Sequence, residues 1–166
     1  MRGALLTMLL CIALALAACG GSSSSGSSSG EESSAPAKSA EESTKTQPKV
    51  TVPSGPPPKQ LVENDLVEGS GAEAKAGDEV TVQYVGVGYT SKEEFDSSWS
   101  RNEPFPFALG AGQVIPGWEE GIVGMKVGGR RELIIPPELA YGTAGSPPAI
   151  GPNETLIFVV DLLSAE

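Results

Sequence analysis

Histidine is absent from the 166-residue sequence, and this absence removes much of the chemistry on which enzymes rely. Without it the chain has no Ser-His-Asp triad, no Cys-His pair, no histidine metal ligand and no histidine general base. Cysteine is nearly as scarce, because the two residues, Cys11 and Cys19, both lie among the first twenty positions. The rest of the chain therefore has neither a disulfide nor a thiolate nucleophile. We expect no metal and no cofactor.

Basic residues are few, and the imbalance of charge lies in one part of the chain. The sequence has 11 basic and 21 acidic residues, for a net charge of -10. Residues 58–166 contain 17 acidic and 7 basic residues and account for all of it, whereas residues 1–57 contain four of each. Nucleic acids attract basic surfaces, so we expect no nucleic-acid partner. The length favours one domain with attachments.

Residues 1–18 have the pattern of a secretory signal peptide, with Met1-Arg2 followed by an apolar run from Ala4 to Ala18. The run is shorter than the ~18–20 residues of a membrane-spanning helix. It ends in Leu16-Ala17-Ala18-Cys19, which resembles the lipobox of bacterial lipoproteins. By this resemblance Cys19 carries lipid and holds the protein on the outer face of the cytoplasmic membrane, in the cell envelope. Ordinary cleavage, with Cys19 unmodified or removed, is the alternative.

Residues 19–57 are predicted to be a disordered tether that begins with the lipidated cysteine. They contain a Gly/Ser tract, then mostly Ser, Ala, Glu, Lys and Thr, and finally the start of a proline run. Such a composition buries too little apolar area to offset the entropy lost on ordering, and the prolines stiffen its end. A mucin-like or partner-binding segment is the alternative. The folded domain is therefore expected at residues 58–166.

Short strands separated by Gly/Pro turns fill this domain. The clearest is residues 79–85, where polar residues alternate with β-branched or aromatic ones, as in a strand buried on one face. Residues 155–163 are the most apolar and are expected at the centre of a sheet. Further strands are expected at residues 61–67, 94–98, 105–109 and 130–135.

One short helix is predicted within residues 114–125. Pro116 suits its first turn, where no intrahelical N–H bond is lost. An apolar face follows from the helical spacing of Trp118, Ile122 and Met125. Glycines in the segment lower its helix propensity, so packing must stabilise it. The pattern indicates an α+β domain, with an antiparallel sheet wrapped over one helix whose indole forms the floor of a pocket.

Four motifs stand in this domain in a fixed order: Phe95-Asp96-Ser97-Ser98, Arg101-Asn102-Glu103-Pro104-Phe105, Val114-Ile115-Pro116-Gly117-Trp118-Glu119-Glu120-Gly121 and Ala140-Tyr141-Gly142. In order and near-spacing they resemble the FKBP family, the macrolide-binding peptidyl-prolyl isomerases. The resemblance runs from about residue 61 to the end of the chain. It implies the family fold, a half-open antiparallel sheet of five or six strands curled around a short helix, in agreement with the pattern above.

The resemblance also implies the residues of the site. Catalytic contributions are carried over to Tyr84, Asp96, Ile115 and Tyr141. Substrate-binding roles are carried over to Phe95, Arg101, Phe105, Gln113, Val114, Trp118, Ile150 and Phe158. By this resemblance the proline ring lies on the indole, while the Ile115 N–H and the Tyr141 hydroxyl hold substrate carbonyls. Asp96 accepts hydrogen bonds, which we expect to come from Tyr84.

The residues themselves allow simpler interpretations. Trp118 on an apolar helix face can be ordinary core, and Asp96 with two following serines can merely initiate a turn. Arg101 is either a surface charge or a partner of Asp96. The chain also departs from the common family pattern, since Ser146 stands where histidine is frequent and Ala149 where isoleucine is frequent. These differences concern the rim of the pocket rather than its floor.

The function implied is acceleration of X-Pro bond rotation in exported proteins by an apolar aromatic pocket. The implied partners are proline-containing peptides, unfolded exported proteins, macrolide ligands and, through the lipid anchor, the membrane. We expect a monomer. The alternative is a non-catalytic module or chaperone of the cell envelope that binds proline peptides or a ligand, and an inert spacer is a third hypothesis.

Overall fold

The computed structural model describes residues 45–166. The predicted signal peptide, the candidate lipidation site Cys19 and residues 20–44 of the predicted tether lie outside the described residues. Over residues 45–166 no helix combines the length and the hydropathy needed to cross a membrane.

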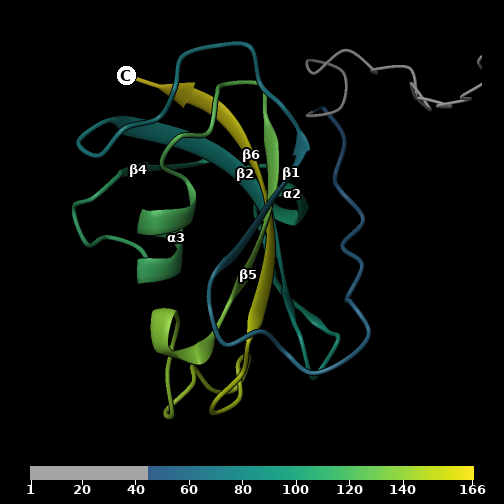
Figure 1. Ribbon diagram of the computed structural model, residues 1–166. Helices are drawn as coiled ribbons and strands as arrows, with labels where there is room; N and C mark the ends of the chain where they lie inside the picture. Colours follow the sequence, from purple (N-terminus) through teal and green to yellow (C-terminus); the bar gives the residue numbers. More distant parts are fainter. Residues whose placement is uncertain (1–44) are drawn as a thin grey trace, which may run out of the picture. The chain divides into compact units, whose positions relative to one another are not determined.

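A single antiparallel sheet forms the centre of the domain (Figure 1). The strands are β1 (Val62–Val67), β2 (Glu79–Gly88), β3 (Glu94–Ser97), β4 (Phe105–Ala108), β5 (Arg130–Ile135) and β6 (Leu156–Ala165). Their order is β1-β5-β6-β2-β3, and β4 also pairs with β2. The most apolar strand, β6, is therefore central, as the sequence predicts, and every strand expected from the sequence is present.

Three short helices accompany the sheet. The predicted helix is α3 (Pro116–Gly121), whereas α2 (Ser98–Arg101) and the 3-10 helix η1 (Pro137–Leu139) were not expected from the sequence. The fold class is confirmed: an open antiparallel sheet of six strands with few helices, and α3 on one of its faces.

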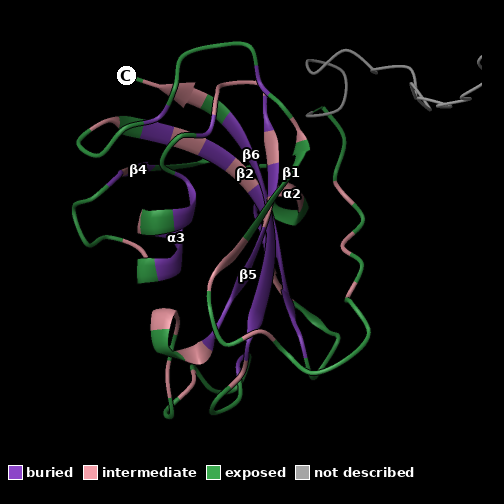
Figure 2. Cartoon of the chain, in the orientation of Figure 1, coloured by how far each residue is buried: buried purple, intermediate pink, exposed green. Residues whose placement is uncertain are grey.

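The main core lies between the sheet and α3 because side chains alternate along β5 and β6. Leu133, Ile135 and Phe158 belong to the cluster that also contains Trp118 and Ile122 from the helix segment. We call this side of the sheet the pocket face. Figure 2 shows buried residues along the central strands and on the sheet-facing side of α3.

Two glycines allow α3 to lie directly on the sheet. A Cβ atom added at Gly117 would come within 2.3 Å of Ile135 Cγ2, and one added at Gly121 within 2.6 Å of Leu133 Cδ2. Real Cβ atoms do not approach so closely, so a side chain at either position would require the helix or the contacting side chain to shift. The residues that weaken α3 as an isolated helix are thus those that let it pack closely.

The opposite side of the sheet, the outer face, carries a second cluster made by Tyr89, Ile134 and Ile157. It is covered by residues 45–57, which we call the strap. Val50 and Val52 of the strap pack on this cluster. In Figure 1 the strap runs along the side of the sheet away from α3.

A buried ion pair fixes the start of the strap. Asp161 is fully buried and accepts hydrogen bonds from Arg130 Nε at 2.5 Å and Nη2 at 2.9 Å. The same Nη2 donates to the Thr46 carbonyl at 2.8 Å. Burial raises the pKa of Asp161, and the Arg130 guanidinium opposes that shift. The strap carbonyl thus gives the guanidinium a third acceptor.

The structure differs from the predicted tether over residues 45–57. The prediction considered the apolar area of this segment alone, and that area is small. The alternation of Val50 and Val52 places two side chains against the apolar cluster on the outer face of the sheet. Residues 45–57 therefore pack against the domain that the sequence analysis places at residues 58–166.

The strap predicts a position-specific effect on stability. In the full chain, Val52→Asp is expected to lower the free energy of unfolding by about 1–2 kcal/mol, because a charge replaces a methyl contact on the outer face. Thr51→Asp is the matched control, since Thr51 is exposed. Urea unfolding followed by tryptophan fluorescence measures both. Equal midpoints for the two variants would show that the strap contributes nothing to stability.

Candidate active site

A pocket of about 310 Å³ opens beside the start of α3. It brings together ten of the predicted site residues from six separate stretches of the chain. The residues lining it are Tyr84, Phe95, Asp96, Phe105, Gln113, Val114, Ile115, Trp118, Tyr141 and Phe158. Asp96 is the one formally charged residue of this lining, so the pocket is an apolar cup with a single carboxyl group at its wall.

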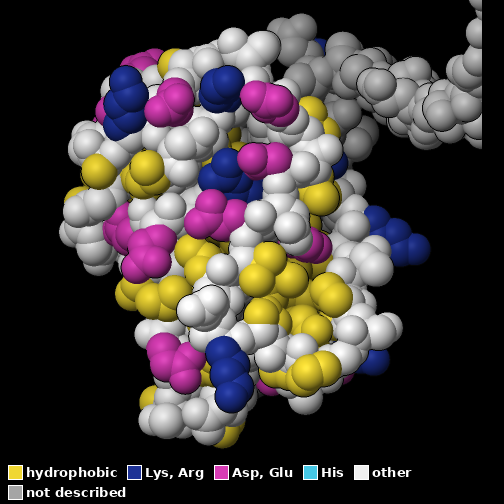
Figure 3. Space-filling model, viewed as in Figure 1, with side chains coloured by type: hydrophobic (Ala, Val, Ile, Leu, Met, Phe, Trp, Pro, Cys, Tyr) yellow, Lys and Arg dark blue, Asp and Glu magenta, His cyan; other side chains and the backbone are white. Residues whose placement is uncertain are grey.

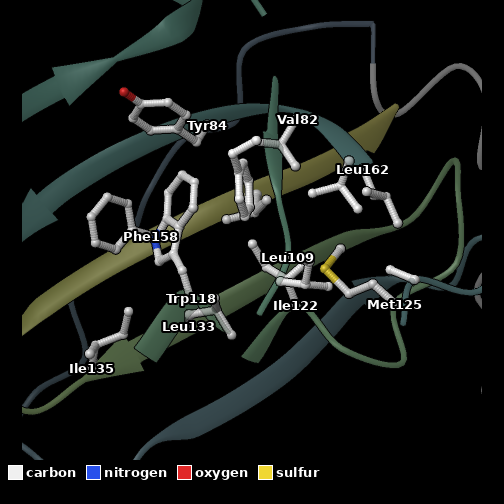
Figure 4. Packing of buried hydrophobic residues seen from close by; sticks show 14 of the residues in the cluster. Val82, Tyr84, Leu109, Trp118, Ile122, Met125, Leu133, Ile135, Phe158 and Leu162 are labelled. Carbon is white, nitrogen blue, oxygen red and sulfur yellow. The ribbon is translucent and has the colours of Figure 1, made fainter. Parts of the chain in front are cut away.

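The floor is an aromatic cluster around Trp118. The Tyr84 and Phe158 rings meet the indole edge-on, with centroid distances of 5.0 Å and 5.1 Å. Figure 4 shows these three rings together at one end of the core cluster. Trp118 is 4% exposed, and its Nε1 has no hydrogen-bond partner within residues 45–166. Such edge-on contacts fix the ring positions more strictly than aliphatic packing does.

Gly86 on β2 is a site residue that the sequence reasoning missed. A Cβ atom there would lie 2.7 Å from Phe95 and 2.8 Å from Phe158. These two rings meet edge-on at 5.5 Å directly over the glycine. The available signal was a glycine inside a strand, which often marks a close approach by another group.

The wall of the cup holds a hydrogen-bonded group of Tyr84, Asp96 and Arg101. The Tyr84 hydroxyl donates to Asp96 Oδ2 at 2.6 Å, as expected from the sequence. Arg101 Nη1 donates to Asp96 Oδ1, and Arg101 Nη2 donates to the Tyr84 oxygen at 2.9 Å. Of the two interpretations of Arg101, the partner of Asp96 is the correct one. Arg101 therefore acts behind the lining rather than in it.

The short helix α2 brings Arg101 back over Asp96. Ser97 caps it by accepting a hydrogen bond from the Ser100 N–H, and Asn102 ends it in a left-handed conformation. The one turn between them places residue 101 beside residue 96. Ser98, fully buried, accepts a hydrogen bond from the Tyr84 N–H at 2.8 Å and so joins α2 to β2.

This group keeps a carboxylate ionised beside an apolar floor. Burial by itself raises the pKa of Asp96, but hydrogen bonds from Tyr84 and Arg101 outweigh it and lower that pKa below its ordinary value. Burial, followed by the hydrogen bond to Asp96, raises the pKa of Tyr84. The same hydrogen bonds raise the pKa of Arg101. Neutral pH therefore leaves all three groups in one protonation state.

Besides the buried Trp118 Nε1, the Ile115 N–H and the Tyr141 hydroxyl at the pocket have no hydrogen-bond partner among the described residues. The Ile115 N–H precedes α3, and the Trp118 and Glu119 N–H groups of that helix bond to the Ile115 carbonyl. Tyr141 follows η1 and is 41% exposed. Both are free to bind a carbonyl group in the cup.

Ile150 is the one predicted residue that lies outside this arrangement. It belongs to the main core, is 6% exposed, and forms an isolated bridge with Ser146. The family resemblance implies a place for Ile150 at the edge of the pocket, and that role stays a prediction.

The site has no acid–base or metal machinery of a common kind. Residues 45–166 contain no group of three His, Cys, Asp or Glu side chains suited to a metal ion. Acidic side chains are scattered over the face drawn in Figure 3 rather than gathered in one patch. An apolar cup with one ionised carboxylate and the free Ile115 N–H and Tyr141 hydroxyl can bind a planar amide or lactam and stabilise a rotated form of it.

Comparison with known proteins agrees with this geometry. Residues 71–163 match the model of the FKBP-type peptidyl-prolyl cis-trans isomerase family. An FK506-binding protein of Streptomyces anulatus is 56% identical over 119 residues, covering 71% of this chain and 96% of the relative. A probable FK506-binding protein of Corynebacterium glutamicum is 52% identical over 119 residues, covering 72% and 98%. Both alignments are longer than residues 58–166, so they extend into the strap.

Solved structures share the fold. FkpA from Escherichia coli has a TM-score of 0.59 at 47% identity, over 64% of this chain and 48% of that one. AtFKBP13 has a TM-score of 0.60 at 38% identity, over 64% of this chain and 93% of that one. The family match contains every residue that lines the pocket. With this match, these relatives and this cup, the chain belongs to the FKBP-type peptidyl-prolyl cis-trans isomerase family.

Proposed function

We propose that this chain is a lipid-anchored monomer that accelerates X-Pro rotation in exported proteins outside the cytoplasmic membrane. The observation that carries the catalytic part is the ionised Asp96, held by Tyr84 and Arg101 at the wall of an aromatic cup. The anchoring part rests on the sequence Leu16-Ala17-Ala18-Cys19.

Rotation about an X-Pro bond is slow because amide resonance sets a barrier of ~18–20 kcal/mol. The planar amide is charge-separated, and water stabilises it. The twisted form has lost resonance and much of its dipole. A pocket that excludes water therefore disfavours the planar form more than the twisted one, which lowers the barrier.

The lining residues suit these requirements. The proline ring would lie on Trp118, with Phe105, Val114 and Phe158 as walls. The Ile115 N–H and the Tyr141 hydroxyl would hold the carbonyls on either side of the rotating bond. Asp96 would present a negative charge to the twisted amide and would not transfer a proton, because its pKa is lowered.

The same cup is our proposed macrolide site. The relatives from Streptomyces anulatus and Corynebacterium glutamicum are named for binding FK506. A ring that imitates proline would occupy the floor in place of the substrate, so such a ligand would compete with proline peptides.

A non-catalytic binding module is the second hypothesis, and Asp96 separates it from an enzyme. Asp96→Ala is expected to lower kcat/KM for a proline peptide about tenfold or more, since each ~1.4 kcal/mol lost from the transition state is tenfold. Affinity for the peptide should change much less. Glu93→Ala is the control, because Glu93 is an exposed acidic residue three positions before Asp96. Cis/trans relaxation and peptide titration measure the two quantities. A wild-type chain that leaves relaxation unchanged at micromolar concentration would refute the enzyme.

The protonation states predict a flat pH profile. From about pH 6 to 8 kcat/KM should be constant, because no side chain proposed to act titrates there. The folded pKa of Asp96 lies below its ordinary value of 3.8, so its ion pair is intact at neutral pH and is lost as pH falls through that lower pKa. Activity and stability should therefore decline together only below about pH 4. Relaxation rates with parallel fluorescence unfolding at each pH test this, and a bell-shaped profile near neutrality would exclude the mechanism.

The anchor predicts different behaviour for the two cysteines. In a bacterial host, Cys19→Ser should move the protein from the membrane fraction to the soluble extracytoplasmic fraction and remove labelling by an acyl probe. Two or more acyl chains give stable anchoring. The proposed diacylglycerol group is attached through the Cys19 thiol, which serine lacks. Cys11→Ser is the control, because Cys11 lies within the predicted signal peptide. This change should alter neither the fractionation nor the acyl labelling. Acyl labelling that persists in Cys19→Ser would contradict the proposal.

A further inference from the structure

The loop between β4 and α3 carries three lining residues but has no regular structure of its own. Gln113, Val114 and Ile115 follow a turn in which Gly110 has φ +83° and Gly112 has φ +71°. Left-handed glycines alone leave a chain with many accessible conformations. Something else must hold this turn if the Ile115 N–H is to meet a substrate in a fixed position.

Glu119 supplies that restraint from the helix. The Gly110 N–H donates to its Oε2, and the Gly112 N–H donates to its Oε1 at 2.8 Å. Both carboxylate oxygens are therefore used by the backbone of the turn. Among the ion pairs formed within residues 45–166, none includes Glu119. The Glu119 carboxylate therefore interacts with backbone N–H groups of the loop rather than with a Lys or Arg side chain of the described residues.

A second tie closes the loop from the other side. The Ala108 N–H donates to Gln113 Oε1 at 3.2 Å. The Glu119 N–H itself donates to the Ile115 carbonyl at 3.2 Å. Gln113 is thus tied to the end of β4, and Ile115 is tied to the first turn of α3. The Glu119 carboxylate, on α3, binds the turn that lies between β4 and Gln113.

We infer that Glu119 is a positioning residue for substrate binding, which acts by bridging the Gly110 and Gly112 N–H groups and so holding residues 113–115 in their binding conformation. It does not line the pocket. The inference deepens the proposed function and rests on it. Without the bridge the loop is ordered only when substrate binds, so binding weakens while the rotation step at Trp118 and Asp96 is little changed.

The test is Glu119→Gln, which keeps one acceptor oxygen and replaces the other with an NH2 group facing a backbone N–H. We expect KM for a proline tetrapeptide to rise about tenfold with kcat within about twofold, since a hydrogen bond to a charged group is worth ~1.5–3 kcal/mol and ~1.4 kcal/mol is tenfold. Glu120→Gln is the matched control: the same change, one residue on, at an exposed side chain without a hydrogen bond to another described residue. It should leave both constants unchanged.

Amide hydrogen exchange provides a readout that does not depend on activity. In Glu119→Gln the exchange rates of Gly110 and Gly112 should rise, while those of the central strand β6 stay as in the wild type. Faster exchange throughout the domain, or equal KM values for the two variants, would overturn the inference. A wild-type chain without isomerase activity would refute the proposed function instead, and the exchange rates would still decide whether Glu119 holds the turn.

Discussion

The packing of α3 on the sheet is the contact on which the rest of the site depends. Because Gly117 and Gly121 present no side chain to Ile135 and Leu133, the helix backbone lies close against β5. The close packing of α3 determines how near the Trp118 indole lies to the sheet, and the indole forms the floor of the cup. It also places the first turn of α3 where the Ile115 N–H and the Glu119 carboxylate can serve the neighbouring loop. A side chain at either glycine would disturb all of these at once.

Charge is arranged differently on the two faces of the same sheet. On the pocket face, Asp96 keeps part of its surface exposed and is held ionised by Tyr84 and Arg101. On the outer face, Asp161 is fully buried and has Arg130 as its ion-pair partner. A buried charge is tolerated when its hydrogen-bonding capacity is satisfied. The first arrangement lies at the wall of the cup, and the second joins the strap to the sheet.

Local patterns in the sequence predicted most of the fold. Alternation located β2, continuous apolar character located β6, and the spacing of Trp118, Ile122 and Met125 located the apolar side of α3. Ten of the twelve pocket residues proposed by family resemblance line one cavity, and Arg101 lies directly behind it. Their assigned roles remain predictions.

The features that the sequence did not reveal depend on distant partners. The packing of the strap was not predicted because Val50 and Val52 bury apolar area only against a cluster that includes Ile134 and Ile157, far along the chain. The bridge that Ile150 forms with Ser146 is likewise a feature of a loop without strand or helix periodicity. The role of Gly86 is defined by two rings that arrive from β3 and β6. Periodicity within a segment carries no information about such partners.

The strap also separates the start of the described chain from the cup. The chain enters along the outer face, at Thr46 beside Arg130, whereas the cup lies on the other side of the sheet. Under the proposed anchoring, a pull at the start of the strap would act on the outer face of the sheet and reach the loops around Trp118 only through the sheet.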